Sequence, residues 1–348
     1  MSNRILIGMS GGVDSSVSAL LLKNEGYEVV GITFRFIDDF SEEDAVKVCE
    51  TLGIEHHVVD YRSEFKKEII DKFLEDYSHG LTPNPCIHCN KVCKFKFLID
   101  NMKKYNCDFI ATGHYAKIDD GKLYKSVDKM KDQSYFLYNI PKDYISKIKF
   151  PLEGYSKDKV RDIARENGLL VADKKDSFDV CFITDSFKKY MNENTSEESG
   201  DIINIDTNEV IGKHNGLSKY TIGQRRGLDI GGTDDRLFVC GKDMTKNILY
   251  VCLGDDNPYL YSNNCIVTDV NLLVDDLPSK CMAKFRYRQN DIEVEVKKID
   301  DNNIKVNYSS LRAVTPGQSC VLYDNDLCLG GGIIKDVYKD TKKIGIML

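Results

Sequence analysis

The sequence predicts an α/β protein, with an N-terminal doubly wound parallel sheet, then a small β-rich domain and a C-terminal β-barrel. In residues 1–168 short apolar runs alternate with helical patterns, which is typical of a parallel sheet with helices on both faces. Beyond residue 192 the apolar runs are short and turn residues are frequent, as in antiparallel sheets. A glycine-rich turn after the first apolar run further favours a nucleotide-binding α/β domain.

The first predicted strand covers residues 4–9. Val17, Leu20 and Leu21 then lie at helical spacing, and Gly26 ends that helix. The same alternation continues through most of the first half of the chain. It predicts a buried strand over 28–34, a helix over 41–52 closed by Gly53, a strand over 57–60, a helix over 65–77, a strand over 108–112 and a helix over 157–167.

A polar, turn-prone segment at residues 192–201 (NENTSEESGD) is typical of a linker. After it, Ile292, Val294 and Val296 alternate with charged residues, which marks a half-exposed strand. We therefore expect three domains. They are a catalytic domain over 1–200, a small β-rich central domain over 205–270 and a β-barrel over 271–348.

The composition excludes several classes of protein. Hydrophobic residues make up 42% and charged residues 30%, so the chain is not intrinsically disordered. No apolar run approaches the roughly 20 residues of a membrane helix, and the N-terminus does not resemble a signal peptide. We expect a cytoplasmic protein with no membrane partner. The net charge of -7 argues against a non-specific nucleic-acid coat, but the lysine-rich segments 91–104 and 142–161 offer basic surface.

The first strand-to-helix turn reads GMSGGVDSS, from Gly8 to Ser16. Glycines let the backbone approach a ligand, and the helix N-terminus offers unpaired N–H groups to a phosphate. The turn contains neither GxxxxGK[ST] nor GxGxxG. It resembles the SGGxDS loop of the PP-loop ATP pyrophosphatases, which include adenine nucleotide alpha hydrolase-like folds and which transfer AMP to a carbonyl oxygen.

This resemblance implies ATP and Mg²⁺ as cofactors. Asp14 would help to hold Mg²⁺, Phe34 would lie by the adenine, and ATGHYA around Gly113 is similar to the family's second nucleotide segment. The residues implied in ATP binding are Gly8, Met9, Ser10, Gly11, Gly12, Val13, Asp14, Ser15, Phe34 and Gly113.

Twelve cysteines occur, and most lie singly in apolar contexts that are typical of buried core residues. Cys89 is different, because it follows a proline-rich loop (TPNPCIHCN) and we expect it at the entrance of a lysine-rich helix. A helix N-terminus and nearby lysines lower the pKa of a thiol and produce the reactive thiolate. Cys181 follows Lys174 and Lys175 later in the chain. One of these cysteines could carry sulfur as a persulfide while the other attacks it.

Metal binding is an alternative for the same residues. Cys86, Cys89 and Cys93 have the spacing CxxCx3C, which suits zinc, with His88 or Cys107 as a further ligand. Together with Cys181 the spacing also suits an iron–sulfur cluster. The spacing alone leaves the three hypotheses open.

The whole set of motifs resembles the tRNA-specific 2-thiouridylase family, in that family's order and over nearly the whole chain. The set comprises SGGVDSS, PNPxxxCN, ATGHYA, KDQSYFL, the segment around Cys181, YTIGQRRGL, FRYRQ and TPGQ. The resemblance implies ATP-dependent 2-thiolation of the wobble uridine of tRNA through an adenylated uridine. Its implied partners are tRNA and, as sulfur donor, a cysteine desulfurase with sulfur-relay proteins.

The resemblance also implies residue roles. Cys181 would carry the persulfide, and Cys89 would be the nucleophile that leaves a Cys89–Cys181 disulfide, so these two form a redox pair. The target base would contact Asn84, Pro85 and Cys86. The tRNA would contact Lys131, Asp132, Gln133, Arg286 and Tyr287. A flipped-out uridine is expected, as for other enzymes that act on a base.

Two departures from the family pattern keep alternatives open. Many members have Asp in place of Cys86 and an aliphatic residue in place of Cys93. No metal is required, but an iron–sulfur-dependent tRNA thiolase would use Cys86, Cys89 and Cys181 as ligands. The other enzyme class is a PP-loop ligase that transfers nitrogen, which would not need paired cysteines. A non-enzymatic RNA-binding module with a vestigial nucleotide loop is a third hypothesis, and the intact Asp14 and Ser15 argue against it.

Overall fold

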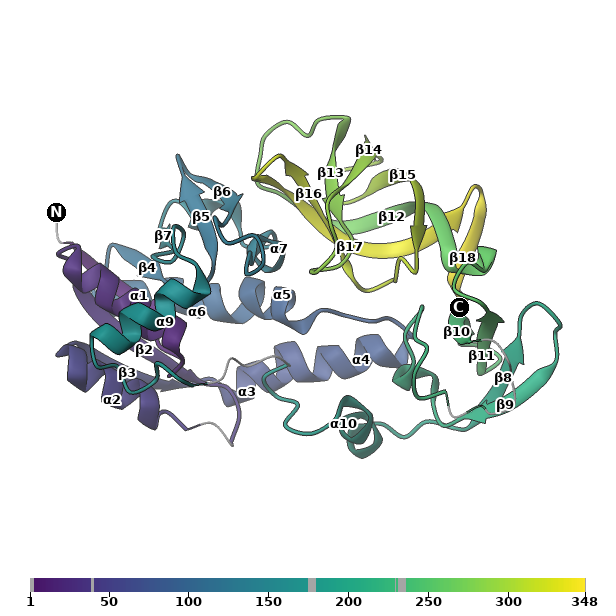
Figure 1. Cartoon of the computed structure of the whole chain (residues 1–348), viewed down its shortest axis with the longest axis horizontal. Coiled ribbons are helices and arrows are strands. Elements are labelled where there is room, and N and C mark those ends of the chain that lie inside the picture. Colours follow the sequence, from purple (N-terminus) through teal and green to yellow (C-terminus); the bar gives the residue numbers. More distant parts are fainter. Residues whose placement is uncertain (1–2, 39–40, 175–179, 229, 231–235, 348) are drawn as a thin grey trace.

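The computed structural model describes residues 3–38, 41–174, 180–228, 230 and 236–347. Figure 1 shows three parts. The N-terminal sheet and its helices lie at the left. The barrel lies at the upper right, and a small β-rich part lies below it, with the C-terminus between the two. Within the described ranges, no helix has the length and apolar character needed to cross a membrane.

The N-terminal sheet is parallel, as expected, with the strand order β3-β2-β1-β4-β7. Its strands are β1 (Arg4–Gly8), β2 (Glu28–Arg35), β3 (Glu55–Asp60), β4 (Phe109–Ala111) and β7 (Ile148–Lys149). Side chains of a strand alternate between the two faces. Ile5 and Ile7 pack in one apolar cluster and Leu6 in another, so both faces of the sheet are buried.

Helices cover both faces, which confirms the doubly wound arrangement. One face packs against α1 (Val13–Asn24), α2 (Glu43–Leu52) and α9 (Lys157–Glu166). The other packs against α6 (Phe95–Lys104). The remaining helical segments are α3 (Arg62–Phe65), η1 (Lys66–Asp71), α4 (Lys72–Ser78), α5 (Pro85–Cys89), η2 (Asn90–Lys94), α7 (Ser134–Leu137), α8 (Lys142–Ile145) and α10 (Phe187–Asn194).

The C-terminal barrel has six antiparallel strands and is closed, because β12 pairs with both β15 and β17. The strands are β12 (Tyr261–Leu272), β13 (Lys280–Lys284), β14 (Ile292–Lys298), β15 (Ile304–Arg312), β16 (Ser319–Asp324) and β17 (Leu327–Lys339). The first barrel strand therefore begins ahead of residue 271.

The small β-rich part contains β8 (Gly200–Asn204), β9 (Val210–His214), β10 (Leu237–Asp243) and β11 (Ile248–Leu253), with the 3₁₀ turns η3 (Leu217–Lys219) and η4 (Pro258–Leu260). The last strand, β18 (Lys342–Met347), pairs antiparallel with β17 and parallel with β10. Thus the C-terminal strand connects the barrel to the small β-rich part through one continuous sheet.

The barrel also shares a core with the N-terminal domain. Tyr135 and Tyr138 are fully buried and pack in one cluster with Tyr323 of β16. The hydroxyl of Tyr135 donates to the Ser319 carbonyl at 3.0 Å. A hairpin of β5 (Ala116–Asp119) and β6 (Lys122–Lys125) extends from the N-terminal domain and pairs with β17. Burial of this apolar surface holds the barrel firmly on the N-terminal domain.

Candidate active site

The glycine-rich turn lies between β1 and α1. Gly11 has a positive φ of 69°, and Gly12 is the N-cap of α1. The hydroxyls of Ser10 and Ser15 lie 3.2 Å apart, and the Ser15 hydroxyl donates to the Gly12 carbonyl at 3.1 Å. These contacts shape a compact loop at the N-terminus of a 12-residue helix, where the helix dipole and unpaired N–H groups favour an anion.

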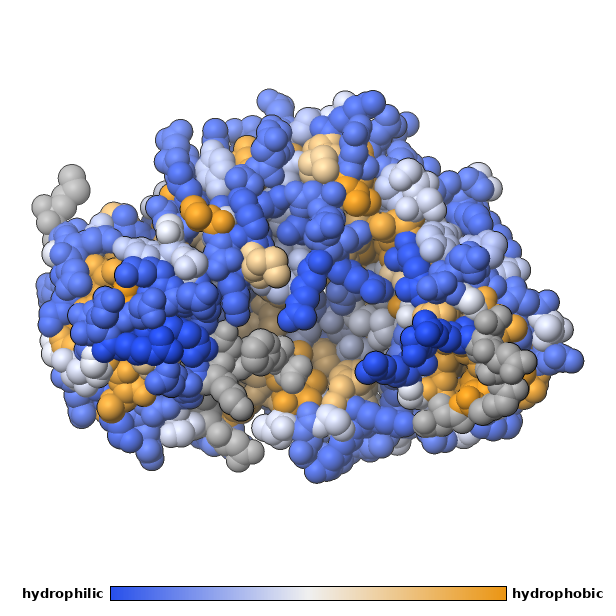
Figure 2. All heavy atoms as spheres, viewed as in Figure 1, coloured by the Kyte–Doolittle hydropathy of each residue, from blue (hydrophilic) through white to orange (hydrophobic). Residues whose placement is uncertain are grey.

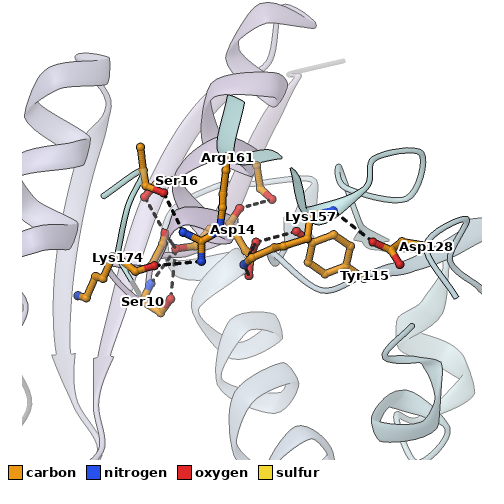
Figure 3. Close-up of polar contacts among 12 residues, drawn as sticks. Ser10, Asp14, Ser16, Tyr115, Asp128, Lys157, Arg161 and Lys174 are labelled. Carbon is orange, nitrogen blue, oxygen red and sulfur yellow. Dashed lines mark hydrogen bonds and ion pairs between the residues drawn. The ribbon is translucent and has the colours of Figure 1, made fainter. Parts of the chain in front are cut away.

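Asp14, in the first turn of α1, is held by two side chains from distant elements. The hydroxyl of Tyr115 donates to its carboxylate at 2.8 Å, and Nζ of Lys157 lies 2.8 Å from each carboxylate oxygen. The Lys157 side chain is only 9% exposed. Figure 3 shows Lys157 reaching Asp14 beside the ring of Tyr115. A nearly buried cation therefore lies at the edge of the loop.

A second lysine lies at the same loop. Nζ of Lys174 donates to the Gly11 carbonyl at 3.1 Å and pairs with Asp44 at 2.6 Å. Arg161 donates to the carbonyl oxygens of Ala172 and Lys174, which orders the chain before Lys174 (Figure 3). The loop thus combines helix N–H groups with two ammonium groups, which suits a polyphosphate. The Asp14 carboxylate is an oxygen ligand of the kind that Mg²⁺ prefers, so these residues fit ATP and Mg²⁺.

Gly113 packs directly against the first turn of α1. A Cβ atom at Gly113 would lie 2.7 Å from the carbonyl carbon of Asp14 and from the Ser15 nitrogen. Glycine is required here because the two backbones approach so closely. Phe34, at the end of β2, lies in an aromatic group with ring centroids 5.5 Å from Tyr61 and 5.9 Å from Phe97. Of the remaining loop residues, Gly8 ends β1, and Met9 and Val13 are buried in the core.

The cysteine segment differs from the expectation at one point. The helix begins at Pro85, so Cys89 lies at the end of α5 and not at the entrance of a helix. Asn84 caps α5 by accepting from the Ile87 N–H at 3.4 Å. Proline suits the first helical position and Asn suits the cap, so the proline-rich loop turns into a helix earlier than its sequence suggested. Asn84 is half-buried, Pro85 is buried and Cys86 is exposed.

The pKa of Cys89 is lowered by a neighbouring thiol and not, as the sequence suggested, by a helix N-terminus. The Cys93 thiol hydrogen-bonds the Cys89 sulfur and, with a smaller contribution from Lys94, lowers the pKa of Cys89 to about 7 despite its burial. The pKa of Cys93 is raised correspondingly. Cys89 therefore lies in surroundings that favour a thiolate near neutral pH.

The fold brings Cys181 to this segment. Although its side chain reaches solvent, the surrounding protein desolvates the Cys181 thiolate and raises the pKa of Cys181 to about 12. The nearby Cys89 and Cys86 act in the same direction, and Lys94 opposes them. Cys181 is exposed, and Phe182 beside it packs in the same apolar cluster as Cys89 and Cys93. Cys86, Cys89 and Cys181 therefore lie within electrostatic reach of one another, next to one lysine. All three are free thiols.

The described residues include no group of three His, Cys, Asp or Glu side chains that could hold a metal ion. Cys93 is completely buried in the apolar cluster. Figure 2 shows that the face in view is hollowed between the three parts of the molecule, with hydrophobic residues visible inside a hydrophilic rim.

The residues implied in tRNA contact lie in two environments. Asp132 is buried, and its carboxylate accepts from the Ser126 N–H, the Ser134 N–H and the Ser134 hydroxyl. Gln133 accepts from the Tyr115 N–H at 2.9 Å and so supports the tyrosine that binds Asp14. Asp132 and Gln133 therefore make contacts within the protein. Lys131, which precedes them in the chain, is half-buried.

On the barrel, Arg286 is exposed, and it donates to the Ala313 carbonyl at 2.6 Å and to the Thr315 hydroxyl at 3.0 Å. The ring of Tyr287 lies 4.4 Å from that of Phe136, centroid to centroid. The barrel residues thus meet the N-terminal domain close to the segment after Lys131.

Sequence reasoning missed Tyr115 and Lys157 as partners of Asp14. Tyr115 lies within the quoted ATGHYA motif, so its place beside Gly113 was a usable signal. Lys157 is 143 residues from Asp14, and it looks like an ordinary first residue of an amphipathic helix. Lys174 was noted for its proximity to Cys181, while the structure also brings it to Gly11.

Family models match three consecutive parts of the chain. Residues 3–185 match the tRNA methyl transferase HUP domain, residues 188–253 match the tRNA methyl transferase PRC-barrel domain, and residues 262–334 match the aminomethyltransferase beta-barrel domain.

Three curated relatives carry the name tRNA-specific 2-thiouridylase MnmA. The relative from Bacillus velezensis is 44% identical over 361 residues, which cover 98% of this chain and 97% of the relative. The relative from Bacillus subtilis is 43% identical with the same coverage. The relative from Staphylococcus carnosus is 44% identical over 367 residues and covers 99% of both chains.

Proposed function

Because the chain belongs to the tRNA-specific 2-thiouridylase family, we propose that it uses ATP to replace the C2 oxygen of a tRNA uridine with sulfur. The enzyme is a sulfurtransferase that modifies tRNA. The observation that carries the proposal is the meeting of Cys86, Cys89 and Cys181 beside Lys94, in the same domain as a loop suited to ATP. A nitrogen-transferring ligase would not need these three neighbouring cysteines. We further propose that the uridine is the wobble base of the anticodon.

The first half of the reaction activates the base. The N–H groups at the start of α1 bind phosphate, and Lys157 and Lys174 neutralise its charge. Asp14 would hold Mg²⁺, which would supply charge neutralisation at the phosphates. The O2 atom of uridine attacks the α-phosphate of ATP, pyrophosphate leaves, and O2 becomes part of an AMP leaving group. Phe34, near the carboxyl end of β2, and Gly113, just after β4, would contact the nucleotide.

The second half delivers sulfur. The terminal sulfur of a Cys181 persulfide attacks C2 of the activated uridine, and AMP leaves with the former O2. The Cys89 thiolate then attacks Sγ of Cys181, which releases 2-thiouridine and forms a Cys89–Cys181 disulfide. A dithiol reductant supplies two electrons to restore both thiols. A cysteine desulfurase, acting through sulfur-relay proteins, supplies the next persulfide sulfur.

The substrate contacts follow from the same arrangement. The exposed Cys86 and the half-buried Asn84 lie just before Cys89 in the chain, and with Pro85 they receive the flipped base. Lys131, Arg286 and Tyr287 bind the tRNA backbone and stem. Asp132 and Gln133 shape the segment that presents Lys131 through their internal hydrogen bonds.

The test is mass spectrometry of nucleosides from tRNA incubated anaerobically with the enzyme, ATP, Mg²⁺ and a persulfide donor. Cys89→Ser and Cys181→Ser should each abolish 2-thiouridine formation. Cys107→Ser is the matched control, because Cys107 is a buried cysteine that does not belong to the three proposed for the reaction. This variant should still form 2-thiouridine. A nitrogen-containing product, or full activity of both Cys89 and Cys181 variants, would contradict the proposal.

Cys86→Ser separates the persulfide relay from an iron–sulfur mechanism. In the relay Cys86 transfers no sulfur, so this variant should still form 2-thiouridine. In a cluster mechanism it loses a ligand, and product formation should fall together with the iron content of the same sample. Iron and zinc are therefore assayed on every preparation.

A further inference from the structure

The segment that carries the thiolation residues is held at its base by the barrel. Thr82 lies just before Asn84 in the chain. The Thr82 N–H donates to the Pro316 carbonyl at 3.0 Å, and the Gln318 side-chain Nε2 donates to the Thr82 carbonyl at 2.7 Å. Both polar groups of the Thr82 backbone are thus bound by one barrel turn, residues 315–318, which we call the barrel turn.

The barrel turn is itself tightly fixed. The Gly317 N–H donates to the Ile334 carbonyl at 2.8 Å, and the Ile334 N–H donates to the Gln318 carbonyl at 2.8 Å. Gly317 has a φ of 91°, and a Cβ atom there would lie 2.7 Å from the Thr82 nitrogen. The close approach to Thr82 therefore requires glycine, and the turn is anchored on β17.

The small β-rich part supports the same segment from another side. Lys242 on β10 is completely buried, and its Nζ donates to the Gly80 carbonyl at 3.0 Å. Burial lowers the pKa of Lys242 to about 7. The Thr82 hydroxyl lies 3.5 Å from that of Thr221. The chain from Gly80 to Thr82 is therefore bound by residues of both other parts of the protein.

The barrel turn also connects to the RNA side of the barrel. Arg286 donates to the Ala313 carbonyl and to the Thr315 hydroxyl, and Thr315 is the first residue of the barrel turn. The residue proposed to contact tRNA and the turn that binds Thr82 thus share hydrogen bonds. The Gln318 N–H donates to the Thr315 carbonyl at 3.2 Å, so a chain of hydrogen bonds connects Arg286 to Gln318.

We propose that Gln318 is a positioning residue for thiolation: by holding Thr82, it places Asn84, Cys86 and Cys89 against the base of a tRNA bound on the barrel. The consequence for the reaction rests on the proposed function, whereas the effect on the segment does not. A displacement of about 1 Å at a reacting group can cost roughly 100-fold in rate. Gln318 should therefore affect the rate of sulfur transfer more than the binding of either substrate.

Gln318→Glu tests the proposal, because it keeps the side-chain shape but places an acceptor opposite the Thr82 carbonyl. The single-turnover rate of 2-thiouridine formation should fall by about tenfold or more, while the affinities for tRNA and for ATP with Mg²⁺ stay unchanged. Gln318→Asn keeps the donor on a shorter side chain and should give an intermediate rate. Asn208→Asp, the same type of change at an exposed residue between β8 and β9, is the control and should match wild type.

A second measurement needs no tRNA or sulfur donor. Cys89 is only 9% exposed, and a loosened segment should expose it. Iodoacetamide should therefore alkylate Cys89 several-fold faster in Gln318→Glu than in wild type or Asn208→Asp. If wild type makes no 2-thiouridine, the proposed function fails, but the alkylation rates still test the role of Gln318.

Wild-type rates of both alkylation and thiolation in Gln318→Glu would overturn the inference. A fall in tRNA affinity that accounts for the whole loss of rate would overturn it as well, because Gln318 would then act through binding. If Gln318→Glu does not fold, the thiolation and alkylation rates of Gln318→Asn test the role of Gln318 instead.

Discussion

The ammonium group of Lys157 lies 2.8 Å from both carboxylate oxygens of Asp14, although 143 residues separate the two in the chain. The contact joins the start of α9 to the first turn of α1, at the edge of the glycine-rich loop. It places a nearly buried positive charge where ATP phosphates are proposed to bind.

Lys157→Met should impair activation of the base. A hydrogen bond to a charged group contributes about 1.5–3 kcal/mol, so the rate of tRNA-dependent pyrophosphate formation should fall roughly 10- to 100-fold. The measurement is the release of labelled pyrophosphate at saturating tRNA. Lys159→Met, an exposed position on the same helix, is the control. Equal rates in the two variants would show that Lys157 has no part in the reaction.

Gly113→Ala should separate the two backbones that meet at the nucleotide loop. The added Cβ would lie 2.7 Å from the Ser15 nitrogen, so α1 or the 113 segment must move. Overpacking of this kind costs about 1–3 kcal/mol of unfolding free energy, and ATP affinity should fall as well. Urea unfolding and calorimetric titration measure the two effects. Gly154→Ala, where a Cβ meets nothing within 4 Å, should change neither.

Cys93→Ala should shift the pH dependence of Cys89 reactivity. The Cys93 thiol is the largest cause of the lowered pKa of Cys89, about 7, so in wild type the thiolate forms as the pH rises through neutrality. Without that hydrogen bond the pKa of Cys89 rises, and its alkylation rate should reach half of its maximum at higher pH. Peptide mass spectrometry follows alkylation at Cys89. An unmoved profile would mean that Cys93 does not stabilise the thiolate, and Cys107→Ala is the control.

Lys131→Ala should reduce the salt dependence of tRNA binding. If Lys131 contacts a phosphate, the slope of log K against log salt should decrease by about 1. Filter binding over a series of salt concentrations measures the slope. Lys298→Ala removes an exposed lysine that pairs with Asp301 after β14, and this variant should leave the slope unchanged. Equal slopes for wild type and Lys131→Ala would show that Lys131 does not contact a tRNA phosphate.

The parallel sheet could be predicted closely because its signals are local. The strand expected at 4–9 is β1 (Arg4–Gly8), and the helix expected at 41–52 is α2 (Glu43–Leu52), which Gly53 ends with a φ of 61°. Apolar periodicity and glycine stops act within a few residues of each other. The PP-loop turn could be located for the same reason.

The start of the cysteine helix was predicted wrongly. Two prolines in TPNPC favoured an extended loop, yet Pro85 is the first residue of α5 and Asn84 is its cap. A proline fits either conformation, so the local sequence is ambiguous and packing decides. The β5–β6 hairpin was missed because it is short and is completed by pairing with β17.

The sequence by itself determined the order of the elements, the nucleotide loop and the cysteines available for sulfur chemistry, since these depend on residue type and short spacing. Tertiary structure alone decided which side chains meet. It brought Lys157 to Asp14, Cys181 to Cys89, and Gln318 to Thr82. Such contacts depend on how whole elements pack across buried apolar surface, and no short stretch of sequence specifies that packing.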